Sequence, residues 1–88
     1  MFDTIIRGGT VLDGTGRPGF TADVGITAGK IAAVGALSAA PASRVIDASG
    51  RVVTPGFIDI HRHADAAAFR PGYGELELRQ GLTTIVNG

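Results

Sequence analysis

Cysteine is absent from the chain, so disulfide bonds cannot stabilise a small fold here. An excess of either charge is also missing, because eight basic and eight acidic residues give a net charge of zero. A neutral chain has no overall attraction for the phosphates of nucleic acid or for an anionic membrane surface. We therefore expect neither nucleic acid nor a membrane as a partner.

Long hydrophobic runs are lacking as well. Asp3 and Arg7 interrupt the opening residues, so the chain has no signal-peptide pattern. No apolar run approaches the roughly 20 residues that a membrane-spanning helix requires. These two absences lead us to expect a cytoplasmic protein.

Glycine is the residue type in excess. It accounts for 14 of the 88 residues, about twice its usual share of roughly 7%. The glycines stand singly or in pairs between short apolar runs, which is typical of turns between strands. With 44% hydrophobic and 18% charged residues the composition is that of a globular chain. So short a chain makes at most one small domain with a modest core.

The first half of the chain predicts a series of short strands separated by turns, spaced as in a β-sandwich or small barrel. Gly8 and Gly9 are expected to end the first of them, and residues 28–30 to close a tight hairpin. Residues 36–43 contain a proline and are expected to form a loop. The expected strands are residues 2–7, 10–12, 20–26, 31–34, 44–48 and 51–54.

The second half changes character after Pro55-Gly56. Residues 57–61 are expected to form a hydrophobic strand, residues 75–80 a helix ended by Gly81, and residues 83–86 another strand. This order is one β-α-β unit, which implies a parallel sheet covered on both faces. A single unit cannot provide that cover, so we expect the chain to be unstable alone, or to need partner copies or further chain.

Both histidines of the chain stand at the end of the strand expected over residues 57–61. Because side chains on a strand alternate, His61 and His63 are expected on the same side, with Asp59 one step below them. Neutral imidazoles are good ligands for zinc and related metals, so the pair predicts a metal site. Asp59 is a candidate acceptor for an imidazole N–H, or a structural residue. Asp65 could contact substrate or metal-bound water, or could equally be a solvated or helix-capping loop residue.

The surroundings of the histidine pair favour the metal site over a simpler interpretation. A His-x-His pair is often no more than two surface residues, but this pair follows an apolar strand opened by Pro55-Gly56. Ile58 and Ile60 are expected to point away from the histidines, into a packed layer. A non-catalytic, β-rich binding or assembly module would explain the strands, the glycines and the neutral charge. It would not predict this order of residues.

The run from Pro55 to His63, Pro-Gly-Phe-Ile-Asp-Ile-His-Arg-His, resembles the Pro-Gly-Phe-Ile-Asp-x-His-x-His signature of the amidohydrolase superfamily. The resemblance covers nearly the whole chain. It implies that residues 1–54 belong to a small β-sandwich and that residues 55–88 begin a (β/α)8 TIM-like barrel. The implied fold class is α/β overall and mainly β in these residues. The other similar segments are residues 5–14, 23–26, 29–35, 45–53 and 81–86.

The same resemblance implies a metal-dependent hydrolase acting on the C–N amide bond of a small molecule. In that family the two histidines after the first barrel strand bind metal, and they correspond to His61 and His63. Zinc or another divalent metal is implied, with one or two ions in the complete enzyme and a metal-activated water. The catalytic acid–base residue of the family is a late barrel Asp, which is not present in this chain and which Asp59 and Asp65 do not replace.

The segment from Gly81 to Gly88 is similar to the N-acyl-D-amino-acid deacylase, or D-aminoacylase, branch of the family. In that branch the chain continues into a short segment that carries a cysteine ligand. Arg62 and Ala64 do not exclude the hydantoinase and dihydroorotase branches, which imply cyclic amide substrates. A naturally short protein kept for interaction is a further alternative. On the favoured interpretation, the chain alone binds metal weakly and does not catalyse.

Overall fold

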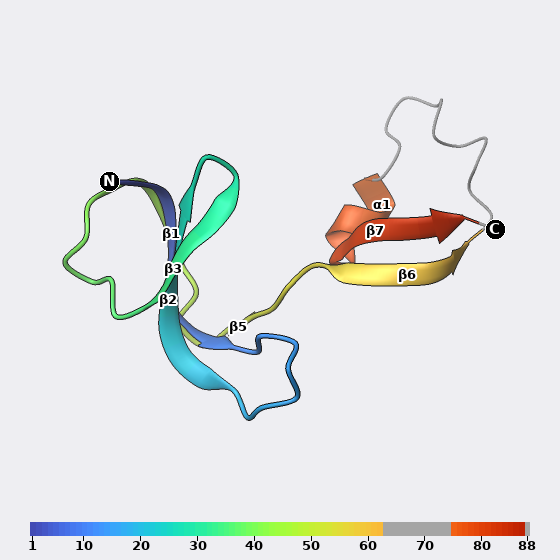
Figure 1. Cartoon of the computed structure of the whole chain (residues 1–88), viewed down its shortest axis with the longest axis horizontal. Helices are drawn as coiled ribbons and strands as arrows, with labels where there is room; N and C mark the ends of the chain where they lie inside the picture. Colours follow the sequence, from blue (N-terminus) through green and yellow to red (C-terminus); the bar gives the residue numbers. More distant parts are fainter. Residues whose placement is uncertain (63–74, 88) are drawn as a thin grey trace. The chain divides into compact units, whose positions relative to one another are not determined.

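The structure, a computed structural model, describes residues 1–62 and 75–87. It divides into two compact units, Met1–Pro55 and Gly56–Gly88. Strands account for most of the regular structure that it describes (Figure 1), as the sequence predicts. No described helix is both long and apolar enough to cross a membrane. That residues 1–54 belong to a β-sandwich and residues 55–88 to a barrel stays a prediction.

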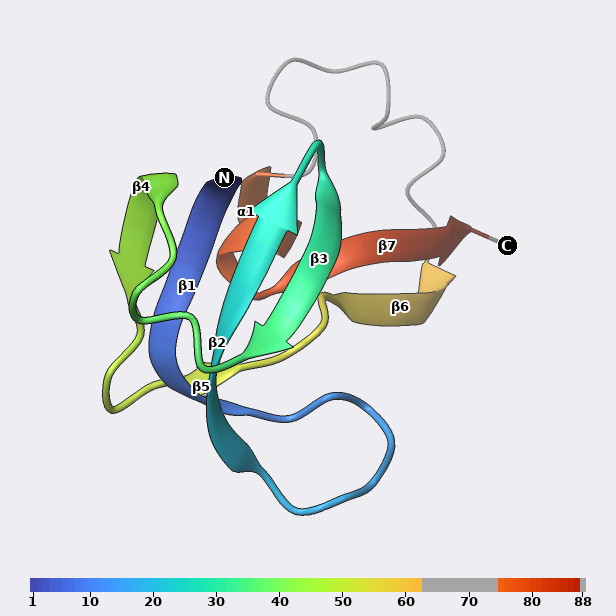
Figure 2. The same cartoon turned by 60° about the vertical axis from the view of Figure 1, so that its left-hand side comes forward.

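The first unit is a five-stranded sheet built around β1 (Phe2–Val11). β1 pairs antiparallel with β2 (Phe20–Thr27), which in turn pairs antiparallel with β3 (Lys30–Gly35). On its other side β1 pairs in parallel with β4 (Ala42–Asp47) and, further along, with β5 (Val52–Val53). Figure 2 shows the order β4, β1, β2 and β3 across the sheet.

β1 continues through Gly8 and Gly9, where the sequence analysis expected it to end, so residues 2–7 and 10–12 are parts of one strand. Its pairing with β2 shifts register between Ile6 and Gly9, as in a β-bulge, and Gly8 has a φ of 74° that glycine adopts without strain. Gly9 lies so close to its neighbours that an added Cβ would be 2.5 Å from Val53 Cγ2. The glycine pair therefore bends the strand instead of ending it.

The hairpin between β2 and β3 lies where the sequence predicts it. Its two central residues, Ala28 and Gly29, have φ angles of 52° and 76°. Positive φ at both positions is the geometry of a type I′ turn, whose twist matches that of the flanking strands. The Asp3 carboxylate accepts a hydrogen bond of 2.7 Å from the Ala28 N–H.

β5 is shorter than the strand expected over residues 51–54, since only Val52–Val53 is paired as a strand. A turn precedes it, in which the Arg51 N–H donates to the Ala48 carbonyl at 2.9 Å. The Ala48 N–H donates to the Arg7 carbonyl at 2.8 Å, and the Thr10 N–H donates to the Arg51 carbonyl at 2.9 Å. The turn thus spans the bulged part of β1 and interrupts what would otherwise be one long neighbouring strand.

A cluster of buried apolar residues lies on one face of the sheet in the first unit. The buried side chains are Val11, Ala22 and Val24, with Ile6, Ile26 and Val53 packed against them. Val24 and Ile26 share this face, as alternation along the strand predicts. Ile5 is fully buried, and its position between two residues of the core face places it on the opposite side.

The second unit has the predicted order of strand, helix and strand. β6 (Phe57–Arg62) pairs in parallel with β7 (Leu82–Asn87), and α1 (Glu75–Arg79) comes before β7. Gly81 has a φ of 84°, and its N–H donates to the Leu78 carbonyl at 3.0 Å. The predicted glycine at the helix C-terminus is therefore confirmed.

The prediction that Ile58 and Ile60 enter a packed layer is wrong for this chain. Their exposed fractions are 60% and 77%. The described part of the second unit offers two strands and one five-residue helix, which is too little to cover both faces of a parallel sheet. β6 is consequently an exposed strand here rather than a buried one.

Candidate metal-binding strand

β6 carries the predicted metal ligand His61 near its carboxyl end, one residue before the strand stops at Arg62. Side chains at the carboxyl ends of parallel strands in barrels are the ones that reach an active site. His63 and Asp65, the other two candidates from this segment, lie outside the described residues. A metal shared by His61 and His63, and a substrate or water contact of Asp65, therefore stay predictions.

Asp59 lies two residues before His61 on the same strand and is half-buried. It pairs with Ile85 of β7 through the backbone ladder. Asp59 therefore lies on the strand that carries His61. Its role beside the metal ligands stays a prediction.

The amino-terminal part of β6 is out of simple register with β7. Phe57 pairs with Leu82, whereas Ile58 pairs with Thr84, so Thr83 is an extra residue on β7. The alternation of residues along the strand does not predict this shift. A signal for it is the glycine at position 56, because a residue without a side chain lets a neighbouring strand approach closely.

A second register shift falls at His61 itself. Asp59 pairs with Ile85 and Arg62 with Asn87, so three steps on β6 match two on β7. The extra residue lies at the Ile60–His61 step, a β-bulge in the strand that carries the proposed ligand. Strict alternation, on which the expectation of a shared side for the histidines depends, is interrupted here.

Asp23 is the buried acidic residue of the first unit, with an exposed fraction of 8%. Its carboxylate accepts hydrogen bonds from the N–H groups of Leu37 and Gly8, each 2.8 Å long. These two bonds, that of Leu37 foremost, hold the pKa of Asp23 below its ordinary value. Through these bonds Asp23 of β2 holds the loop after β3 and the bulge of β1 in place. The sequence did not predict this structural role.

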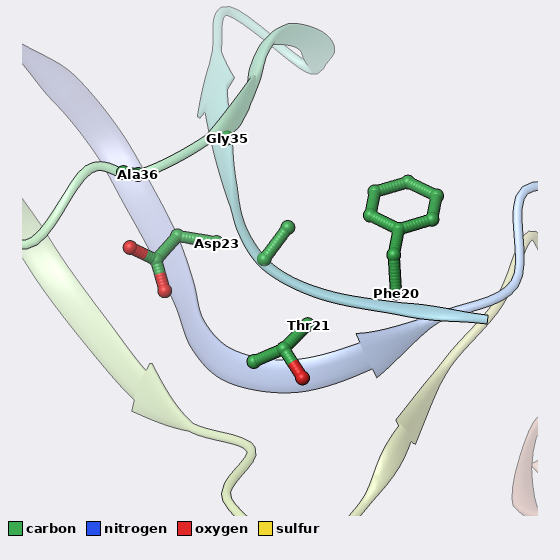
Figure 3. A pocket seen from close by; sticks show the side chains of 6 residues that line it. Phe20, Thr21, Asp23, Gly35 and Ala36 are labelled. Atoms are coloured by element: carbon green, nitrogen blue, oxygen red, sulfur yellow. The ribbon is translucent and has the colours of Figure 1, made fainter.

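A hollow of about 350 Å³ in the first unit lies beside β2, where β3 has ended at Gly35 (Figure 3). The Asp23 carboxylate is directed away from the Phe20 ring (Figure 3), and its oxygens are engaged with the main chain. Across residues 1–62 and 75–87, no three His, Cys, Asp or Glu side chains are grouped to hold a metal. The lining residues of the hollow are Phe20, Thr21, Ala22, Asp23, Gly35 and Ala36.

Comparison with protein families gives a match to the amidohydrolase family over residues 44–88. The chain is 53% identical over 87 residues to N-acyl-D-glutamate deacylase of Alcaligenes xylosoxydans xylosoxydans, covering 98% of this chain and 18% of that protein. The chain thus spans less than a fifth of the length of this relative.

Solved structures give matches of the same kind. A D-aminoacylase with a binuclear metal centre has a TM-score of 0.93 and 51% identity, over 100% of this chain and 19% of that chain. N-acyl-D-glutamate deacylase of Bordetella bronchiseptica, complexed with zinc and a phosphonate inhibitor, has a TM-score of 0.93 and 46% identity. The match covers 99% of this chain and 18% of that chain. L-hydantoinase of Arthrobacter aurescens is less similar, with a TM-score of 0.75 and 32% identity. The match covers 99% of this chain and 20% of that chain.

Proposed function

The chain belongs to the amidohydrolase family, and from this premise we propose that it is the N-terminal part of a metal-dependent N-acyl-D-amino-acid deacylase. The observation that carries the proposal is the TM-score of 0.93 with a zinc-bound N-acyl-D-glutamate deacylase, over a segment in which β6 ends just after His61. Hydrolysis of the amide bond of a small N-acyl-D-amino acid is the proposed reaction.

The proposed architecture assigns the two units to different parts of the complete protein. The first unit contributes strands to a small β-sandwich, and the second opens a (β/α)8 barrel. The parallel pairing of β6 with β7 supports this assignment, because all the strands of such a barrel are parallel. The exposure of Ile58 and Ile60 supports it too, since further barrel elements would cover them.

His61 and His63 are the residues of this chain that would hold the metal. Their imidazoles suit zinc, and the bulge at His61 fits a ligand position because bulges often lie beside active sites and re-aim side chains. Two histidines fall short of the three or four protein ligands usual for zinc, so we propose that the remaining ligands come from outside these residues. A bound metal would supply an activated water and polarise the substrate carbonyl.

The proposal predicts a defined pattern of hydrolysis for the complete protein. N-acetyl-D-glutamate and other N-acetyl-D-amino acids should be hydrolysed, and their L-isomers more slowly. Removal of metal with a chelator should abolish turnover, and added zinc should restore it. Turnover of hydantoins alone would replace the deacylase with a cyclic amidohydrolase, and turnover unaffected by chelation would overturn the metal-dependent mechanism.

A further inference from the structure

The amino end of β6 is in close contact with β7 through Gly56. A Cβ added at Gly56 would collide with the Oγ1 and Cγ2 atoms of Thr83 and would lie 2.7 Å from its Cβ. Rotation of the Thr83 side chain could move the first two atoms but not the Cβ, which is fixed to the backbone. Any side chain at position 56 therefore forces the two strands apart at this point.

Phe57 adds two contacts at the same end of the strand. Its N–H donates to the Gly81 carbonyl at 2.7 Å. Its ring atoms lie 3.1 and 3.2 Å from the position that a Cβ on Gly81 would occupy, so a side chain there would require a small shift of the ring. The φ of 84° at Gly81 itself favours glycine. Gly56, Phe57, Gly81 and Thr83 are called the β6 clamp below, and Figure 1 shows the two strands that it joins side by side.

The β6 clamp coincides with the first register shift, and the second shift reverses it. Thr83, the extra residue on β7, is the residue that fills the space beside Gly56. Past the bulge at Ile60–His61, Arg62 again pairs at the same offset as Phe57. A strand without the first shift would need no compensating bulge, so the conformation of the backbone at His61 is coupled to the packing at Gly56.

From this coupling we propose that the β6 clamp positions the metal ligand His61. The inference rests on the proposed function, because it assigns to Gly56 and Thr83 a role only if His61 binds metal. Neither residue is proposed to touch the metal or the substrate. They act through the register of β6 on β7, and so through the position of the His61 backbone near the end of the strand.

The test uses the complete protein and the substitution Gly56→Ala. Displacement of a ligand-bearing strand should weaken zinc binding about 10-fold to 100-fold, as losses of supporting contacts around metal sites do. Competition with a chromophoric chelator measures this affinity without relying on turnover. In the zinc-saturated enzyme kcat should fall with KM little changed, and the Phe57 amide should exchange its hydrogen faster than in the wild type.

Two further variants separate positioning from general loss of stability. Gly9→Ala also creates a collision, though a milder one, 2.5 Å from Val53 Cγ2, in a strand of the other unit that carries no proposed ligand. It should lower stability and leave zinc affinity unchanged. The double variant Gly56→Ala with Thr83→Gly removes the three Thr83 atoms nearest to the new Cβ, and it should recover wild-type zinc affinity even if the single variant fails to fold.

Each outcome bears on the inference. Wild-type zinc affinity in Gly56→Ala, an equal loss in Gly9→Ala, or a double variant that is not rescued would overturn it. Failure of the proposed function gives a different result, since the wild-type protein itself would then bind no zinc. In that case the exchange of the Phe57 amide in Gly56→Ala would still report whether the β6 clamp sets the register.

Discussion

Asp23 links three segments of the first unit by two hydrogen bonds from main-chain N–H groups to a buried carboxylate. Because these bonds favour the ionised form, its pKa in the folded protein is lower than the ordinary 3.8. The folded state therefore gains stability from Asp23 above pH 3.8 or so, and loses it as the pH falls through the lowered pKa. Urea midpoints, followed through amide resonances of β1 and β2, should drop in this acid range.

Substitution of Asp23 gives the corresponding prediction at neutral pH. Asp23→Ala should destabilise the first unit more than Asp23→Asn, which keeps an acceptor oxygen for one of the two N–H groups, that of Gly8 or that of Leu37. Asp47→Asn is the matched control, because Asp47 accepts only a local bond of 2.9 Å from the Ser49 N–H among its described main-chain contacts. Equal urea midpoints for Asp23→Ala and Asp47→Asn would contradict the structural role of Asp23.

Asp13 is held in its ionised form on the surface of the first unit. The Thr15 hydroxyl donates to it at 2.5 Å, and the Arg17 guanidinium pairs with its other oxygen. These contacts, that of Thr15 foremost, lower the pKa of Asp13 from 3.8 to about 2. We expect Thr15→Val and Arg17→Gln each to raise this pKa toward 3.8, as measured by carboxyl ¹³C titration. An unchanged pKa in both variants would contradict the role of these contacts.

The β2–β3 hairpin contains a residue that is poorly suited to its backbone conformation. Ala28 has a φ of 52°, and left-handed geometry costs an L-residue other than glycine, asparagine or aspartate about 1–2 kcal/mol. Ala28→Asn creates the Asn-Gly pair preferred in type I′ turns and should raise the free energy of unfolding by about 1 kcal/mol. Ala28→Val should lower it, and identical urea midpoints for the two variants would argue against this turn geometry.

The sequence predicts correctly the turn and the helix end whose geometry depends on residues adjacent in the chain. The hairpin at Ala28-Gly29 and the helix end at Gly81 follow from the φ angles that these short segments need. The continuity of β1 through Gly8 and Gly9 was not predictable in this way. It depends on a partner strand some 40 residues later, where Val53 and Ala48 leave no room for a side chain at Gly9.

The candidate site also has one feature that the local sequence predicts and others that depend on distant residues. The position of His61 at the carboxyl end of a strand could be predicted from the apolar run before it. The register shifts on either side of Asp59 could not, because they depend on how β6 meets β7 across the turn at Gly81. The exposure of Ile58 and Ile60 agrees with the expectation that one β-α-β unit cannot cover both faces of its sheet. Their expected packed layer is not formed within the described residues.

Both units expose large apolar side chains, and the buried core found among the described residues lies in the first unit. The first buries Val11, Ala22 and Val24, whereas the exposed fractions of Phe57, Ile58 and Ile60 in the second range from 53% to 77%. In the 88-residue chain alone, amides of β6 and β7 should therefore exchange much faster than those of β1 and β2. Equal protection of both units would contradict the view that the second unit needs further elements.

The isolated chain also tests how much of the metal site it contains. Because the two proposed histidine ligands are fewer than a zinc site requires, the isolated chain should bind zinc weakly and hydrolyse no N-acetyl-D-amino acid. Zinc titration and a turnover assay on the 88-residue chain measure the two properties. Turnover by this chain alone would show that the residues proposed to come from elsewhere are not needed.

The central claim is that His61 and His63 bind a catalytic metal, and zinc affinity of the complete protein tests it most directly. His61→Ala and His63→Ala should each lose zinc to a chelator that the wild type resists, while Arg62→Ala, which changes the residue between them, should retain it. Retention of zinc by both histidine variants at wild-type affinity would contradict the claim.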